Sequence, residues 1–187
     1  MMTTTLKLSP IIQLTDEQFY RLCQFNPDLR LERNATGELI MNPPTGGDTG
    51  NYNIGLAAQI WNWNEGAKQG KAFDSSTGFK LPNGATRSPD VSWVRLDRWE
   101  SLSLQQQRRF PPLAPDFVIE LMSPSDELSD VQDKMREYID NGVRLGWLIN
   151  RQAGNVEIYR PNPDVEIVQM PVTLTAADVL PGFSLNL

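Results

Sequence analysis

The sequence predicts a mixed α/β fold in which a β-sheet is flanked by helices, formed by one domain over residues 1–187. Three observations support this fold class. An N-terminal helix signal is followed by a β-hairpin signal, an apolar strand near residue 120 leads into an amphipathic helix, and three further strand-like runs complete the chain. The content of 40% hydrophobic and 21% charged residues is typical of a globular protein.

The N-terminal elements have clear boundary signals. Thr15 and Gln18 fit a capping box, so we expect a helix to begin there and to end near Asn26-Pro27. Residues 29–33 and 38–42 read as two strands, joined by a hairpin turn at residues 34–37. The Pro- and Gly-rich residues 43–50 predict a loop.

The remaining elements follow from hydrophobic periodicity. Ile54, Ala57, Ala58 and Trp61 recur at helical spacing and predict a helix over residues 51–65. Strands are expected at residues 72–81 and 91–94. Residues 97–115 are expected to be irregular or weakly helical. A strongly apolar strand is expected at 117–122, followed by a helix at 127–141 that Gly142 ends. Strands at 147–150, 156–160 and 166–170 complete the prediction.

The composition excludes several kinds of chemistry. The chain has no histidine, which excludes His-based hydrolytic triads and His-ligated zinc, so acid–base or metal chemistry must use carboxylates, lysine, tyrosine or water. A net charge of −6 argues against a broad nucleic-acid surface but permits one basic groove. The single Cys23 allows no internal disulfide. No apolar run is long enough to span a bilayer and the N-terminus does not read as a signal peptide, so we expect a soluble cytoplasmic protein with no membrane partner.

Two carboxylates are candidates for a metal site. Glu120 interrupts the apolar strand 117–122, and a buried carboxylate needs either a cationic partner or a metal. Asp90 follows Pro89 at the start of a strand, where an aspartate can also be an ordinary turn residue. If the two strands are neighbours, Asp90 and Glu120 can share one divalent cation, for which Mg²⁺ or Mn²⁺ suits oxygen ligands.

Three further residues are candidates for the same site. Lys134 falls on the flank of the apolar face of the helix 127–141, so its amine can reach toward Glu120 or simply remain at the surface. Glu32 and Glu38 flank the hairpin turn, where each is either an exposed hairpin residue or a contributor to the site.

Several segments together resemble the Uma-type putative restriction endonuclease family of the PD-(D/E)XK nuclease superfamily. The resemblance lies in residues 88–92 and 115–125, and continues through Lys134, Tyr138, residues 141–143 and residues 147–149. It also includes residues 37–39, Pro43-Pro44 and residues 180–183, and so covers nearly the whole chain.

This resemblance implies a restriction-endonuclease-like mixed sheet and a Mg²⁺- or Mn²⁺-dependent endonuclease that hydrolyses DNA. It implies that Asp90 and Glu120 bind the metal, with the backbone carbonyl of Leu121 as a further ligand, and that Glu38 rather than Glu32 completes the site. The superfamily usually carries a lysine two residues after the glutamate, where this chain has Met122, and the resemblance implies that Lys134 replaces it. By analogy we expect a homodimer. The alternative is a catalytically inactive protein of the same fold that acts as a dimeric scaffold or a DNA-associated binder.

Overall fold

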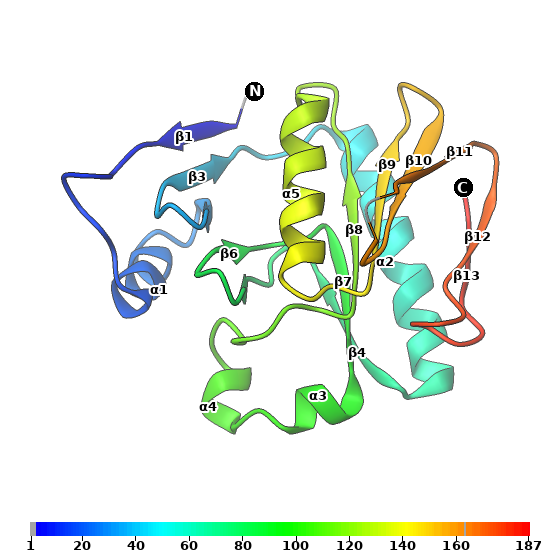
Figure 1. Cartoon of the computed structure of the whole chain (residues 1–187), viewed down its shortest axis with the longest axis horizontal. Coiled ribbons are helices and arrows are strands. Elements are labelled where there is room, and N and C mark those ends of the chain that lie inside the picture. The colour runs from blue at the N-terminus through cyan, green and yellow to red at the C-terminus, as the bar shows by residue number, and fades with distance from the viewer. Residues whose placement is uncertain (1–2, 163) are drawn as a thin grey trace.

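The computed structural model describes residues 3–162 and 164–187. Its centre is a six-stranded mixed sheet with the strand order β11-β10-β9-β8-β7-β4 (Figure 1). Only β8 and β9 run parallel, and the helix α5 (Leu128–Asp140) provides the crossover that a parallel pair needs. The strands are β4 (Gly70–Asp74), β7 (Val91–Arg95), β8 (Phe117–Leu121), β9 (Leu145–Asn150), β10 (Asn155–Tyr159) and β11 (Glu166–Gln169).

The two faces of this sheet form separate cores. Side chains alternate along a strand, so Ile119 of β8 packs with the helix α2 (Gly47–Ala67), whereas Val118 packs with Met135 of α5. Figure 1 accordingly shows α5 on one side of the sheet and α2 on the other. The hairpin of β12 (Thr173–Thr175) and β13 (Ser184–Asn186) joins the α2 face through Leu174 and Leu185. Glu120 lies on the α5 face.

A second, five-stranded sheet with the order β1-β3-β2-β6-β5 lies beside the first. Its strands are β1 (Thr4–Leu6), β2 (Arg30–Arg33), β3 (Leu39–Asn42), β5 (Phe79–Lys80) and β6 (Thr86–Arg87). The helix α1 (Asp16–Phe25) buries Phe19. Both hydrogen bonds of the predicted capping box are present: the Thr15 side chain accepts from the Gln18 backbone N–H, and the Gln18 side chain accepts from the Thr15 backbone N–H. The predicted hairpin is formed by β2 and β3.

Two expected elements differ in the structure, and some strands are additional to the prediction. The helix α2 begins at Gly47, inside the expected loop, and its buried residues are Leu56, Ile60 and Asn64, whereas Ile54 and Trp61 are exposed. The expected strand 72–81 divides into β4 and β5, because the Asp74 carboxylate accepts a hydrogen bond from the Ser76 backbone and holds a turn there. The strands β1, β6, β12 and β13 are additional to the prediction.

Other boundaries agree closely with the sequence prediction. The short helices α3 (Leu96–Glu100) and α4 (Leu104–Gln107) lie in the segment expected to be weakly helical. α5 ends at the expected place, where Gly142 has a φ of 103° that favours glycine. Among residues 3–162 and 164–187, no helix is both long and apolar enough to cross a bilayer.

Candidate active site

The strand register places Asp90 opposite Glu120. Val91 of β7 pairs with Ile119 of β8 in an antiparallel ladder, so the next step of the same register opposes Asp90 and Glu120. Directly opposed residues of an antiparallel pair point to the same face, with Cβ atoms about 5 Å apart. One oxygen of Asp90, Oδ2, accepts a hydrogen bond of 2.8 Å from the backbone N–H of Leu121, which orients the carboxylate at the end of the ladder. The two carboxylates therefore project side by side beneath α5.

Two side chains of α5 hold Glu120. The Tyr138 hydroxyl donates a 2.9 Å hydrogen bond to Glu120 Oε1, and Lys134 Nζ lies 2.9 Å from the same oxygen. Glu120 is 6% exposed and Tyr138 is fully buried. Positions 134 and 138 lie one helical turn apart, so both side chains can reach the strand below them. The structure thus places the Lys134 ammonium against Glu120, as the sequence led us to expect.

The Lys134 ammonium also contacts a carboxylate of the N-terminal hairpin. Lys134 Nζ lies 3.1 Å from Oε1 of Glu32 on β2, a residue that is 3% exposed. Glu32 Oε1 accepts a further hydrogen bond of 3.0 Å from the Ser88 backbone, and Oε2 lies 3.1 Å from Nη1 of Arg87. Arg87 Nε in turn lies 2.5 Å from Glu137 Oε2. A continuous buried ionic network thus joins β2, β6, β8 and α5.

Burial and mutual repulsion perturb the acidic groups. Desolvation raises the pKa of Glu120 to about 7; Lys134 opposes this rise, while the charges of Asp90 and Glu32 add to it. The pKa of Asp90 is also raised, first by desolvation and further by Glu32 and Asp126, against the Leu121 N–H and Lys134.

Glu32 and Lys134 keep their charges. Desolvation would raise the pKa of Glu32, but Lys134, Arg87 and the Ser88 N–H outweigh it and the pKa is lowered. Desolvation would lower the pKa of Lys134, but the carboxylates Glu120 and Glu32 outweigh it and the pKa is raised. Lys134 therefore remains an ammonium and Glu32 a carboxylate at neutral pH.

The charges of this network fit a divalent cation. Glu32, Asp90, Glu120 and Glu137 can carry four negative charges, whereas Lys134 and Arg87 supply two positive ones. The excess of two negative charges equals the charge of one Mg²⁺ or Mn²⁺. Within the part of the chain that the structure describes, no cluster of three or more acidic, cysteine or histidine side chains is arranged to hold a metal. The two carboxylates that could share an ion are Asp90 and Glu120, and Mg²⁺ is often bound by only one or two carboxylates together with waters and substrate phosphate oxygens.

The remaining expected site residues have distinct positions. The backbone of Leu121 reaches the pair through its N–H bond to Asp90. Met122 packs against the core on the α5 face. The Glu38 carboxylate accepts a 2.8 Å hydrogen bond from Asn34 Nδ2 at the hairpin turn, so the contacts bring Glu32, not Glu38, to Lys134.

Sequence reasoning missed three members of the network. Arg87 and Glu137 were not singled out, and Tyr138 was noted in the resemblance without a role. Position 137 is three residues after Lys134 and Tyr138 four, so both share its helix face; that spacing was a usable signal. Arg87 gave no local signal, because its partners Glu32 and Glu137 are 55 and 50 residues away in sequence.

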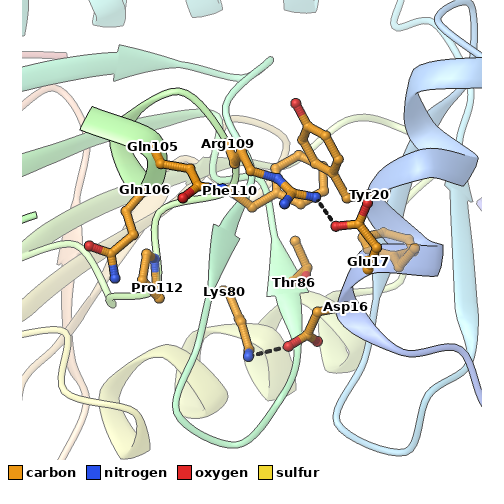
Figure 2. Close-up of a pocket in the computed structure, with 11 residues that line it drawn as sticks. Asp16, Glu17, Tyr20, Lys80, Thr86, Gln105, Gln106, Arg109, Phe110 and Pro112 are labelled. Atoms are coloured by element: carbon orange, nitrogen blue, oxygen red, sulfur yellow. Dashed lines mark hydrogen bonds and ion pairs between the residues drawn. The ribbon is translucent and has the colours of Figure 1, made fainter. Parts of the chain in front are cut away.

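A pocket of about 320 Å³ lies apart from this network, between α1 and the segment 105–112 (Figure 2). At this pocket Arg109 pairs with Glu17, and Lys80 pairs with Asp16. Both cations already have carboxylate partners, and the pocket lining that the structure describes includes no residue of the ionic network. The pocket is therefore not the place where the Asp90–Glu120 pair would meet a substrate.

The geometry can be compared with known proteins. A structure described as a putative nuclease belonging to DUF820, from Anabaena variabilis, has a similar fold: the TM-score is 0.77 at 20% sequence identity, over 92% of this chain and 94% of that one. No curated protein matches the chain. The model of the Uma2 family, described as "Putative restriction endonuclease", matches residues 16–187. This match includes every residue of the buried ionic network, and the chain therefore belongs to the Uma2 family of restriction-endonuclease-like proteins.

Proposed function

We propose that this protein is a metal-dependent endonuclease that hydrolyses phosphodiester bonds of DNA. One observation carries the proposal: Lys134 Nζ lies 2.9 Å from the buried Glu120, which is opposite Asp90 when the β7–β8 register is continued by one residue. The family membership supports a nuclease reading of this arrangement. Asp90 and Glu120 would hold Mg²⁺ or Mn²⁺, and the backbone carbonyl of Leu121 is proposed as a further ligand.

The chain's own residues would prepare the site for a phosphodiester. The Leu121 N–H fixes Asp90, and the Tyr138 hydroxyl fixes Glu120, so that neither carboxylate has to reorganise when the substrate arrives. Lys134 remains charged and would donate a hydrogen bond to a non-bridging phosphate oxygen, where negative charge develops. Asp90 and Glu120 would hold a divalent ion, which would supply a more acidic bound water and neutralisation of part of the phosphate charge.

The overall reaction consumes one water. The water oxygen bonds to phosphorus while the bond from phosphorus to the leaving sugar oxygen breaks. The hydroxyl remains on the phosphate, and the released proton is delivered to the leaving oxygen. The protein's acidic balance means that attraction to DNA has to come from a local surface or from the bound cation, because the net charge of −6 repels a polyanion. Double-strand cleavage would be served by two sites, and we include a homodimer in the proposal for that reason.

The rival function is a non-cleaving DNA-associated protein or dimeric scaffold of the same fold, which Met122 at the usual lysine position favours. Incubation with supercoiled plasmid and with end-labelled oligonucleotides, in Mg²⁺, Mn²⁺ or EDTA, distinguishes the two. We expect wild-type cleavage in either metal, none in EDTA, and a loss of at least 100-fold in Asp90→Asn and Lys134→Met, since each removes a group placed at the reacting phosphate. DNA binding by a wild-type protein that cleaves in neither metal would establish the rival.

A further inference from the structure

We infer that Glu32 is a positioning residue that holds the Lys134 ammonium at the reacting phosphate. The inference rests on the proposed nuclease function and deepens it, because it states how a lysine on a helix can serve a site that usually takes its lysine from the strand. The carrying observation is that Lys134 Nζ has two carboxylate partners at once, at 2.9 Å in Glu120 and 3.1 Å in Glu32.

Lys134 needs a partner other than Glu120. A lysine has a flexible four-carbon stem and carries a large rotamer entropy, so one shared contact does not fix its amine. A divalent cation on Glu120 would neutralise part of the charge of this carboxylate, so its attraction for the Lys134 ammonium would weaken. Glu32 is then the carboxylate that keeps the ammonium in the site, from a strand of the other sheet.

Glu32 is itself firmly fixed. Its Oε2 lies 3.1 Å from Arg87 Nη1, and its Oε1 accepts a 3.0 Å hydrogen bond from the backbone of Ser88, two residues before Asp90. The side chains of Glu32 and Arg87 are only 4% and 11% exposed. One carboxylate thus connects the lysine of α5 to the segment that carries Asp90, so Lys134 and the metal-binding pair are set relative to each other.

The contacts of Glu32 assign it to this positioning role and not to metal binding. Both of its oxygens already accept from donors of the protein, Oε1 from Lys134 and Ser88 and Oε2 from Arg87. Asp90 differs, because Oδ1 accepts no hydrogen bond from any residue in the ranges 3–162 and 164–187, while Oδ2 accepts from Leu121. A cation would displace no protein donor at that free oxygen of Asp90, whereas at Glu32 it would have to displace one.

A mutant cycle tests the inference. Plasmid cleavage in Mg²⁺ is measured for Glu32→Gln, Lys134→Met and the double variant. Glu32→Gln should lower kcat about 10- to 100-fold with little change in KM, as removal of an outer partner of a site residue typically does. The double variant should be no slower than Lys134→Met alone, because Glu32 acts through Lys134. A double variant slower by the full product of the two single effects would overturn the inference.

A matched control separates positioning from a general loss of contacts. Glu157 is buried on β10 and ties α5 to the sheet through Gln132 Nε2 at 2.9 Å, as Glu32 ties it through Lys134. Glu157→Gln should therefore keep the wild-type kcat, and an equal fall in both variants would mean that any lost carboxylate under α5 slows the reaction. If Glu32→Gln does not fold, Glu32→Asp retains the charge but withdraws it from Lys134, and a wild-type kcat in that folded variant would overturn the inference.

Two readouts without cleavage distinguish this inference from the proposed function. Mn²⁺ should raise the melting temperature of Glu32→Gln as much as that of the wild type, and loss of the shift would make Glu32 a metal ligand and refute the positioning role. If the wild type cleaves in neither metal, the proposed function fails. The urea midpoints of the wild type, the two single variants and the double variant then test whether Glu32 and Lys134 interact. Non-additive midpoints support it, and additive midpoints overturn it.

Discussion

Glu120→Gln should stabilise the metal-free protein at pH 8. The pKa of Glu120 is raised from its ordinary value of 4.5 to about 7, mainly by burial, so ionising this group in the folded state is unfavourable. At 1.36 kcal/mol per pKa unit, the rise corresponds to about 3 kcal/mol of folding free energy. Glutamine keeps an oxygen that can accept from Tyr138 and Lys134 but carries no charge. For a chain of this length the gain should raise the melting temperature by about 6–12 °C.

The pH dependence gives this prediction its sign. Between pH 4.5 and about 7 the folded wild type holds a proton on Glu120 that the unfolded chain has already lost, so its stability falls as the pH rises through that window. Glutamine does not titrate, so the variant lacks this pH-dependent loss of stability. The difference in melting temperature should therefore be small near pH 4.5, grow up to about pH 7 and then level off.

Metal should remove most of the difference in melting temperature between the two proteins at pH 8. A divalent cation at 100 times its dissociation constant stabilises the folded protein by about 2.7 kcal/mol, or about 5–10 °C here. Glu120→Gln should lose most of this shift, because it removes one of the two carboxylate ligands. The assay is a thermal melt of both proteins at pH 5 and pH 8, with and without MnCl₂. An equal Mn²⁺ shift in both proteins, or a metal-free variant that melts below the wild type at pH 8, would refute the reasoning.

Two further predictions concern single hydrogen bonds. Tyr138→Phe removes the hydroxyl that donates to Glu120 while keeping the ring in the core, and should cost about 1.5–3 kcal/mol at pH 8 because the lost bond serves a charged acceptor; an unchanged urea midpoint would contradict this. Thr15→Ala removes the side-chain oxygen that accepts from the Gln18 backbone and should cost about 1 kcal/mol, without changing the metal-induced melting shift that Glu120→Gln should lose; circular dichroism melts of both variants check the two effects.

Elements with local signals could be predicted from the sequence. The capping box at Thr15, the hairpin turn at residues 34–37 and the glycine stop at Gly142 are all in place, because each depends on residues within one turn of each other. The strand β8 and the helix α5 were also recognisable. A strand that is buried on both faces has a continuous apolar run, whereas a helix that is buried on one face has apolar residues at helical spacing.

Elements that depend on distant contacts could not be predicted in the same way. The first turn of α2 contains Gly47 and Gly50, which read as breakers, but Asp48 of that turn lies 2.6 Å from Arg151, over a hundred residues later. The strand β6 has only two residues and pairs with β2 through Arg33 and Thr86. Such short strands have no periodicity of their own, so only the assembled sheet defines them.

The candidate site follows the same division. Glu120 was recognisable because a charge inside an apolar strand is locally anomalous. Asp90 was a candidate because it follows Pro89 at the start of a strand, and only the structure shows that this strand pairs with β8. The choice between Glu32 and Glu38 was not accessible from the sequence, since both flank the same turn. The fold decides it through Arg87 and Lys134, which reach Glu32 from β6 and α5.

The position of Lys134 explains why Met122 is compatible with a nuclease-like centre. Met122 lies two residues after Glu120 on the same strand and packs against the core beneath α5, so this position contributes apolar contacts where a lysine would contribute charge. In the proposed site the charge would come instead from Lys134 of the helix that covers the strand, and Glu32 of the second sheet would hold that ammonium in place. A lysine on the helix would thus depend on the carboxylate of Glu32 and on Arg87, which contacts Glu32 and helps to lower its pKa. We therefore expect that Met122→Lys cannot substitute for Lys134, because the new ammonium would lack Glu32 and would have to displace apolar contacts of the core.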